Sequence, residues 1–353
     1  MMVTYSDIRL NNSSLSIAGG GTNGNGNGNG KNNGPVIVFV GGTSGIGRST
    51  FEAVLRHIAS PTIYLVGRSE AGLEQQIQQG QALNPKAKIV PVLTGDLTLV
   101  KSAQTTAQKI ASLAGSRVDL LFLSQGYFSF ATRPNWTVEG LDKITAIRYH
   151  SRMRFVITLL PLLRASPSPR VISILASGKE GTLDLDDLSF KRSYGPVFAA
   201  GASATLNTLA FEALAAQPDN VKIVFIHLYP GGVATGMKAL EGPAMLRFLY
   251  NHTSRSFLKV FGRSLEEVGE RVLFAATNGR FRRLADGVSG EGTMVQRGSN
   301  GNIGSGVYLV QDDSSVVIGN EHVEKLRDQG GPKKVLEHTL AEFERIESSK
   351  AAS

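Results

Sequence analysis

The chain has 353 residues, a formal net charge of +8 and no cysteine. The lack of cysteine excludes disulfides and thiolate metal sites, and no cluster of histidines or carboxylates has the spacing of a metal site. No signal-peptide core and no apolar run of about 18 residues occur, so we expect a cytoplasmic protein without a membrane span. Lysine and arginine are spread along the chain, which indicates a solvated basic surface rather than a nucleic-acid partner.

The first 34 residues predict a flexible N-terminal arm and linker. Residues 18–34 read AGGGTNGNGNGNGKNNG and contain almost nothing that could be buried in a core. Residues 1–17 carry a few apolar side chains, so this part either docks on the body as a short arm or stays loose. From residue 35 to residue 348 we expect a single domain.

The domain alternates strand-like and helix-like segments. Strands are expected at 36–40, 62–68, 88–97, 118–126, 170–177, 221–232 and 304–311, and helices at 46–59, 70–83, 99–114, 139–165, 196–217, 266–278 and 320–348. Nearly continuous apolar strands are typical of a sheet that helices cover on both faces. The pattern predicts an α/β fold with a doubly wound parallel sheet, a three-layer α/β/α arrangement with right-handed crossovers.

The segment 238–303 breaks this alternation. Its first part, 244–264, mixes aromatic, apolar and basic residues. A helix lying on a membrane surface would have this composition, and so would a lid over a ligand cleft. We favour the lid and treat 238–303 as an insert.

The stretch VIVFVGGTSGIGRST, Val36 to Thr50, predicts a nucleotide-binding turn. An apolar strand leads into glycines and then into the start of a helix. Glycines let the backbone approach a phosphate, and the free N–H groups and dipole of a helix start favour negative charge. The candidate contacts in this turn are Gly41, Thr43, Ser44, Gly45, Ile46 and Gly47.

Four motifs in order resemble the short-chain dehydrogenase/reductase family, over roughly Val36 to Gln311. VGGTSGIG is similar to the family's Thr-Gly-x-x-x-Gly-x-Gly turn, LTGDLT to its Asp-Leu pair at the adenine, LSQG to its Asn-Asn-Ala-Gly, and HLYPGGVAT to its Pro-Gly…Thr segment at the nicotinamide. The resemblance implies a Rossmann fold, a small-molecule substrate, and a homo-oligomer formed through the long helices near 139–165 and 196–217. It also implies that a dinucleotide contacts Asp96, Leu97, Ser124, Gly126, Pro230, Gly231 and Val233.

The end of the second strand bears on which dinucleotide binds. An NAD-preferring site places an acidic residue there for the ribose hydroxyls. This chain reads Val-Gly-Arg-Ser at 66–69, and Arg68 offers a guanidinium for a 2′-phosphate. Arg48 adds positive charge, so we expect NADP(H).

The family's proton-transfer pair is missing from the expected place. The family uses a Tyr and a Lys four residues later, which share one helix face. Matching the helix LNTLAFEALA places these positions at Ala200 and Ala204. The family's asparagine position falls near residues 148–150, and its strand serine at Ala176 or Ser177.

Three interpretations follow. The first is a reductase or dehydrogenase with a relocated acid, for which Tyr149, Ser177, Tyr194 and Lys179 are the candidates. Its substrate would be a ketone or alcohol of a hydrophobic secondary metabolite, since VGGTSGIG, LFLSQGY and the run from 149 to 163 also resemble a divergent fungal branch of the family. The second is a non-redox cyclase or isomerase with a cleft wall from Phe248, Tyr250, Phe257 and Phe261. The third is an NADP(H)-sensing regulator. We favour the first.

Overall fold

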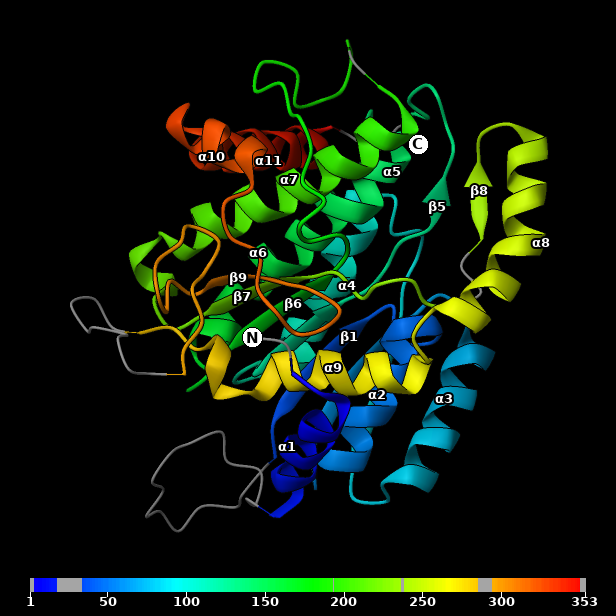
Figure 1. Ribbon diagram of the computed structural model, residues 1–353, viewed down its shortest axis with the longest axis vertical. Coiled ribbons are helices and arrows are strands. Elements are labelled where there is room, and N and C mark those ends of the chain that lie inside the picture. Colours follow the sequence, from blue (N-terminus) through cyan, green and yellow to red (C-terminus); the bar gives the residue numbers. More distant parts are fainter. Residues whose placement is uncertain (1–2, 18–33, 193, 236–237, 285–293, 350–353) are drawn as a thin grey trace.

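The computed structural model describes residues 3–17, 34–192, 194–235, 238–284 and 294–349. Within these residues a seven-stranded sheet has the order β3-β2-β1-β4-β6-β7-β9, and all its strand pairs are parallel (Figure 1). The strands are β1 Val36–Val40, β2 Thr62–Gly67, β3 Lys88–Leu93, β4 Leu120–Leu123, β6 Arg170–Ile174, β7 Val224–Leu228 and β9 Val307–Val310. The order reverses between β1 and β4, which confirms the doubly wound parallel sheet.

Helices cover both faces of this sheet because the strands are apolar on both sides. Val38 and Val40 of β1 point into one core and Ile37 and Phe39 into the other. The first core is closed by α4 Val100–Ala114, α6 Ser151–Arg164 and α7 Pro196–Ala215, and the second by α2 Gly45–His57, α3 Glu70–Leu83 and α9 Leu265–Thr277. The three-layer α/β/α prediction is confirmed. Short 3₁₀ turns lie at Pro218–Asn220 and Gly279–Phe281.

The N-terminal arm docks on the body. Residues Tyr5–Ile17 form helix α1, which lies against α9 (Figure 1). Ile8 is fully buried, and Asn12 Nδ2 donates to Glu270 Oε2 at 2.7 Å. Of the two alternatives for 1–17, the structure shows docking over 5–17, because the few apolar residues there pack against α9. The linker residues 18–33 lie outside the described residues.

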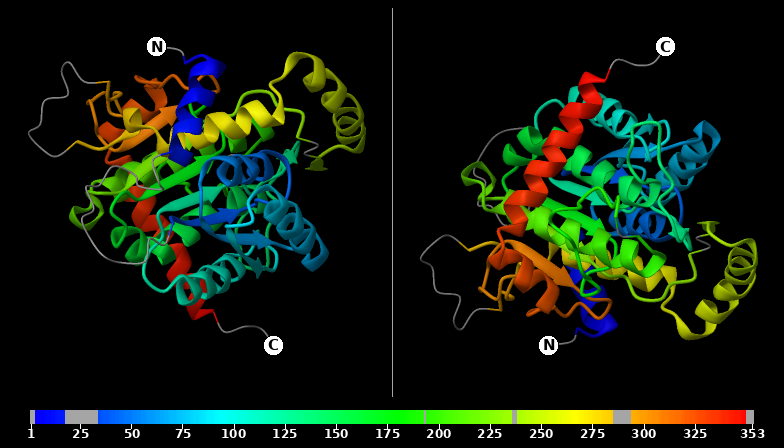
Figure 2. Two further views of the ribbon diagram at one scale, coloured as in Figure 1. Left: turned by 90° about the horizontal axis from the view of Figure 1, so that it is seen from below. Right: turned by 90° about the horizontal axis from the view of Figure 1, so that it is seen from above.

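The predicted insert 238–303 divides into two unlike parts. Helix α9 belongs to the helix layer, and its Gly269 approaches α2 so closely that a Cβ would lie 2.4 Å from Ser49 O. The prediction of a lid or insert region over 238–303 therefore does not hold for this helix, which packs as part of the body. The other part, β8 Ala239–Glu241 and α8 Ala244–Phe261, stands beside the body (Figure 2). β8 pairs with β5 Phe128–Ser129, and the ring of Tyr250 stacks on Phe128 with centroids 4.8 Å apart.

The closing helix expected over 320–348 is two helices, α10 Glu321–Asp328 and α11 Gly331–Ser348. α11 packs along α7 and buries Val335, Phe343 and Ile346 (Figure 2). It therefore forms an extra layer outside α6 and α7.

Candidate functional site

The carboxyl ends of β1, β4, β6 and β7 meet at one edge of the sheet, beside the reversal of strand order where α/β folds bind ligands. The turn after β1 has no room for larger residues. Gly41 has φ +91°, and a Cβ on Gly47 would lie 2.3 Å from both Gly41 O and Ser124 Oγ. Ser44 precedes α2 in an extended conformation and its side chain does not cap the helix, so Ser44 leaves the first-turn N–H groups unoccupied. This cradle fits a phosphate-bearing dinucleotide.

The structure brings most of the predicted cofactor residues to this edge. Thr43, Gly45 and Ile46 lie in the turn itself, Ser124 and Gly126 follow β4, and Pro230, Gly231 and Val233 follow β7. Ser124 Oγ donates to the carbonyl of Val40 or of Gly41, at 3.2 and 3.1 Å, which ties the end of β4 to the glycine turn.

Two predicted contacts lie farther out, at the ends of β2 and β3. Arg68 is exposed directly after β2. Asp96 is exposed after β3, and its Oδ1 accepts from the N–H of Thr98 at 2.9 Å, while Leu97 is buried. An exposed guanidinium and an exposed carboxylate can both reach a ligand along this edge. Their contacts with a cofactor remain predictions.

Tyr149 does not face this edge. It lies on a π-helical turn, Ala146–His150, with only 1% of its surface exposed. Its hydroxyl donates to Thr339 Oγ1 at 2.6 Å, since Thr339 itself donates to the carbonyl of Val335. Burial raises the pKa of Tyr149. The phenol sits between α6 and α11, which argues against the prediction that it is the relocated acid.

Ser177 also has a structural partner. It is fully buried, donates to the carbonyl of Val310 at 2.7 Å and lies 3.1 Å from Gln311 Nε2. These bonds fasten the end of β9, so this geometry too argues against a catalytic role. At the alternative serine position, the N–H of Ala176 donates to His227 Nε2 at 3.2 Å.

Tyr194 lies in the loop before α7 and is partly buried. Its hydroxyl donates to Asp142 Oδ1 at 3.1 Å. Burial and the negative charge of Asp142 raise the pKa of Tyr194, so the phenol keeps its proton at neutral pH. Lys179, the remaining candidate, places its Nζ 5.6 Å from the ring centroid of Tyr229.

The positions matched to the family's Tyr and Lys lie on α7. Ala204 is fully buried and Ala200 is partly exposed. Neither side chain can carry a proton.

Sequence reasoning missed a buried arginine that joins two strand ends. Arg152 of α6 is 1% exposed, and its Nη1 donates to Ser173 Oγ at 2.7 Å and to the carbonyls of Leu123 and Ile174. Its Nη2 donates to the carbonyl of Gln125 at 2.7 Å. Burial lowers the pKa of Arg152 to about 9. The side chain thus fixes the carboxyl ends of β4 and β6 relative to each other.

A second missed arginine, Arg148, stands one helical turn before Arg152. Helix α5 Lys143–Thr145 leads into the π-helical turn that carries it. Arg148 Nη2 donates to the carbonyl of Tyr127 at 2.8 Å, and its own carbonyl accepts from Asn207 Nδ2 at 3.1 Å. The sequence signal for both residues was that Arg148 and Arg152 stand four residues apart, near the position of the family's asparagine.

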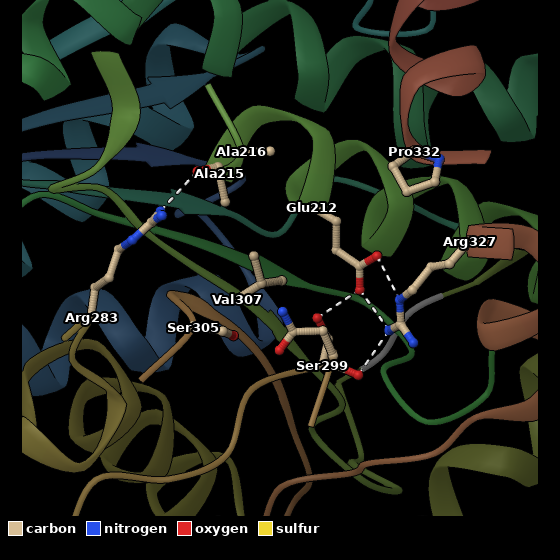
Figure 3. A pocket seen from close by; sticks show the side chains of 10 residues that line it. Glu212, Ala215, Ala216, Arg283, Ser299, Ser305, Val307, Arg327 and Pro332 are labelled. Carbon is tan, nitrogen blue, oxygen red and sulfur yellow. Dashed lines mark hydrogen bonds and ion pairs between the residues drawn. The ribbon is translucent and has the colours of Figure 1, made fainter. Parts of the chain in front are cut away.

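A separate hollow of about 250 Å³ lies at the opposite edge of the sheet, near the amino end of β9 (Figure 3). Its charged groups are already paired. Arg327 Nη2 and Ser299 Oγ donate to Glu212 Oε1 at 2.7 and 2.6 Å, and Arg283 Nη1 donates to the carbonyl of Ala215 at 2.8 Å. These contacts join α7 to the C-terminal segments, and we infer no ligand for this hollow.

Within the described part of the chain, no helix has the length and apolar character needed to cross a bilayer. The same residues contain no group of three or more histidines and carboxylates placed to hold a metal ion.

A sequence profile described as short chain dehydrogenase matches residues 35–245. The chain belongs to this family. It is 37% identical over 306 residues to the Emericella nidulans protein named Oxidoreductase AN1596, covering 86% of this chain and 90% of that one. It is 30% identical to Oxidoreductase lepF of Aspergillus flavus, covering 98% of each. The crystal structure of NADPH-bound carbonyl reductase from chicken fatty liver shares the fold, with a TM-score of 0.52 and 18% identity over 80% of this chain and 98% of the other.

Membership of the short-chain dehydrogenase family makes the chain an oxidoreductase of the class that acts on alcohol and ketone groups. The sheet order and the glycine turn are those expected for the family's nicotinamide cofactor. Alanines stand at positions 200 and 204, the two positions that we matched to the family's Tyr and Lys.

Proposed function

We propose that the protein is an NADP(H)-dependent oxidoreductase that interconverts a ketone and an alcohol on a hydrophobic secondary metabolite. The observation that carries the cofactor proposal is Arg68, an exposed arginine directly after β2 where an NAD site would place an acid. It lies at the same sheet edge as the glycine turn. The bound cofactor would supply a hydride to the substrate carbon.

The substrate proposal rests on the apolar surface beside this edge. Among the described residues of β8 and α8, Leu240, Met245, Phe248 and Leu249 are all more than half exposed. The rings of Phe128, Phe130 and Tyr250 pack together next to them. The side chains of Phe257 and Phe261 lie outside the described residues. Such a surface favours an apolar ligand, and the fungal relatives bear oxidoreductase names.

For the proton we propose Tyr194. It keeps its proton at neutral pH, and a phenol that stays protonated can act as an acid during ketone reduction. Its proton reaches a substrate by rotation about the phenolic C–O bond, away from Asp142. The carboxylate of Asp142 keeps its bonds from the N–H of Asn135 and from the N–H and Oγ1 of Thr145.

The test is the affinity of Arg68→Ala for NADPH and NADH, measured by calorimetry. Loss of a charge-assisted bond of about 1.5–3 kcal/mol weakens binding about 10- to 100-fold, so we expect this loss for NADPH and little change for NADH. Lys86→Ala is the matched control, an exposed basic residue beside the amino end of β3. Equal losses for both cofactors, or wild-type protein that binds NADH as tightly as NADPH, would refute the NADP(H) proposal.

The missing Tyr and Lys favour one alternative, non-redox isomerisation or cyclisation. Deuterium-labelled NADPH separates the two functions. A hydride transfer places deuterium on the product carbon, and isomerisation leaves the product unlabelled.

A further inference from the structure

Arg148 presents a cation that its protein neighbours leave largely uncommitted. A guanidinium has five N–H donors. Among the contacts of the described residues, one bond from Arg148 uses a donor, the bond from Nη2 to the carbonyl of Tyr127. Arg148 is partly exposed as a residue, so a ligand can approach it from solvent.

The nearby carboxylates are engaged elsewhere. Asp142 and Glu241 both act on Arg148 through their charge, but neither forms an ion pair within 4.0 Å of it in the described structure. Asp142 accepts from the N–H groups of Asn135 and Thr145 and from Tyr194. Glu241 likewise has its own partners, since it accepts from Ser129 Oγ at 3.0 Å and from Asn135 Nδ2 at 2.7 Å. The charge of the guanidinium is therefore offset by two carboxylates that do not contact it, and the guanidinium remains able to bind an anion.

Arg148 lies next to the carboxyl end of β4, at the same sheet edge as the glycine turn. Its partner Tyr127 directly follows Gly126, and Arg152 one turn below is bonded to the carboxyl ends of β4 and β6. The amide of Asn207 fixes the carbonyl of Arg148 from α7. The guanidinium is thus held at the end of β4, close enough to Tyr194, in the loop before α7, for the charges of the two side chains to interact.

We propose that Arg148 is a catalytic residue that binds the substrate's carbonyl oxygen and stabilises the negative charge that develops on it. This inference rests on the proposed ketone reduction. The cofactor would supply the hydride for the new C–H bond, and Arg148 would then hold the substrate oxygen, which gains the carbonyl π pair and becomes an alkoxide facing the guanidinium. The alkoxide takes the phenolic proton of Tyr194, and water reprotonates the phenolate. In the alcohol-to-ketone direction the same groups act in reverse.

The electrostatics agree with this pairing. Burial lowers the pKa of Arg148, but a guanidinium remains protonated in proteins. The positive charge of Arg148 acts to lower the pKa of Tyr194, against the effect of burial and of Asp142. It therefore makes the phenol a better acid than the two carboxylates alone would allow.

The test uses 2-naphthoate, an apolar probe whose carboxylate mimics the charged oxygen, and the neutral 2-naphthamide. Both are titrated into the full-length protein with and without saturating NADP⁺. A preformed charge contact is worth at least about 1.4 kcal/mol, so we expect the wild type to prefer naphthoate at least about tenfold. Arg148→Gln should abolish the preference and Arg148→Lys should retain part of it. Arg154→Gln, on the adjoining helix α6 and paired with Glu347 of α11, should keep it.

The outcomes separate this inference from the proposed function. A failure to bind NADPH overturns the cofactor proposal alone, because the naphthoate preference is also measured without cofactor. The role of Arg148 is overturned if naphthoate does not bind, if the wild type shows no preference, or if Arg148→Gln retains it. For any ketone the wild type reduces, Arg148→Gln should lower kcat about 10²- to 10³-fold at unchanged NADPH affinity, and added guanidinium should restore part of it.

Discussion

Tyr149→Phe separates a structural phenol from a catalytic one. The change removes one buried hydroxyl and its 2.6 Å bond to Thr339 Oγ1. Thr339 keeps its own bond to the carbonyl of Val335 at 2.7 Å, so no buried donor is left unpaired. The cost should therefore be that of one neutral hydrogen bond, about 0.5–1.5 kcal/mol of unfolding free energy.

The assay is urea unfolding of Tyr149→Phe, Thr339→Val and the double variant, with turnover measured on each. If the bond accounts for the cost, the double-mutant cycle gives a coupling of at least about 0.5 kcal/mol. Tyr64→Phe is the control, because its hydroxyl also makes one bond, to the carbonyl of Leu113 at 2.7 Å, on another helix. Turnover lost in Tyr149→Phe alone, with unchanged unfolding free energy, would refute the structural role and restore Tyr149 as the acid.

Three further predictions have defined outcomes. Gly47→Ala should abolish dinucleotide binding, measured by fluorescence titration, because its Cβ would lie 2.3 Å from Gly41 O and Ser124 Oγ; unchanged affinity would contradict the cradle. The raised pKa of Tyr194 predicts a flat rate of ketone reduction between about pH 6 and pH 9, and a fall within this range would exclude it as the acid. Burial lowers the pKa of His150 to about 4, so between about pH 6.5 and pH 4 the unfolded chain binds a proton that the folded chain does not. The free energy of unfolding should therefore fall by about 3 kcal/mol as the pH drops through this range. In His150→Phe the fall should be smaller.

The sequence predicted the sheet well because its strands carry their signal locally. The seven expected strands all form, although several end earlier than expected, as β3 does at Leu93 and β7 at Leu228. The sequence alone did not decide whether α1 docks, because Ile8 and Asn12 become buried only against α9, more than 250 residues away in the chain. The same limit applies to α9, whose place in the helix layer depends on its contact with α2.

The site shows the same division between local and distant signals. The strand, the glycine turn and the helix start are encoded within a few residues and form as predicted, and the contacts of the turn with a cofactor stay a prediction. Tyr149 was expected in the cleft because it lies near the family's asparagine position, but Thr339, 190 residues later, covers it. Arg148 was overlooked because the sequence shows only that the family's asparagine is absent near this position. That its guanidinium has donors to spare follows from the fold, in which Asp142 and Glu241 bind other groups.

The C-terminal helix α11 has a consequence for the effect of protein concentration. It lies on α7, its Thr339 and Phe343 contact the turn before α6, and Glu347 pairs with Arg154 of α6. The family resemblance predicts that a second copy binds through the helices near 139–165 and 196–217, and such a contact would weaken on dilution. Here α11 of the same chain packs on α7 and α6, and an intramolecular contact of this kind does not weaken on dilution. We therefore expect the melting temperature to stay constant from nanomolar to micromolar protein, whereas a fold closed by a partner would lose stability at the lower end.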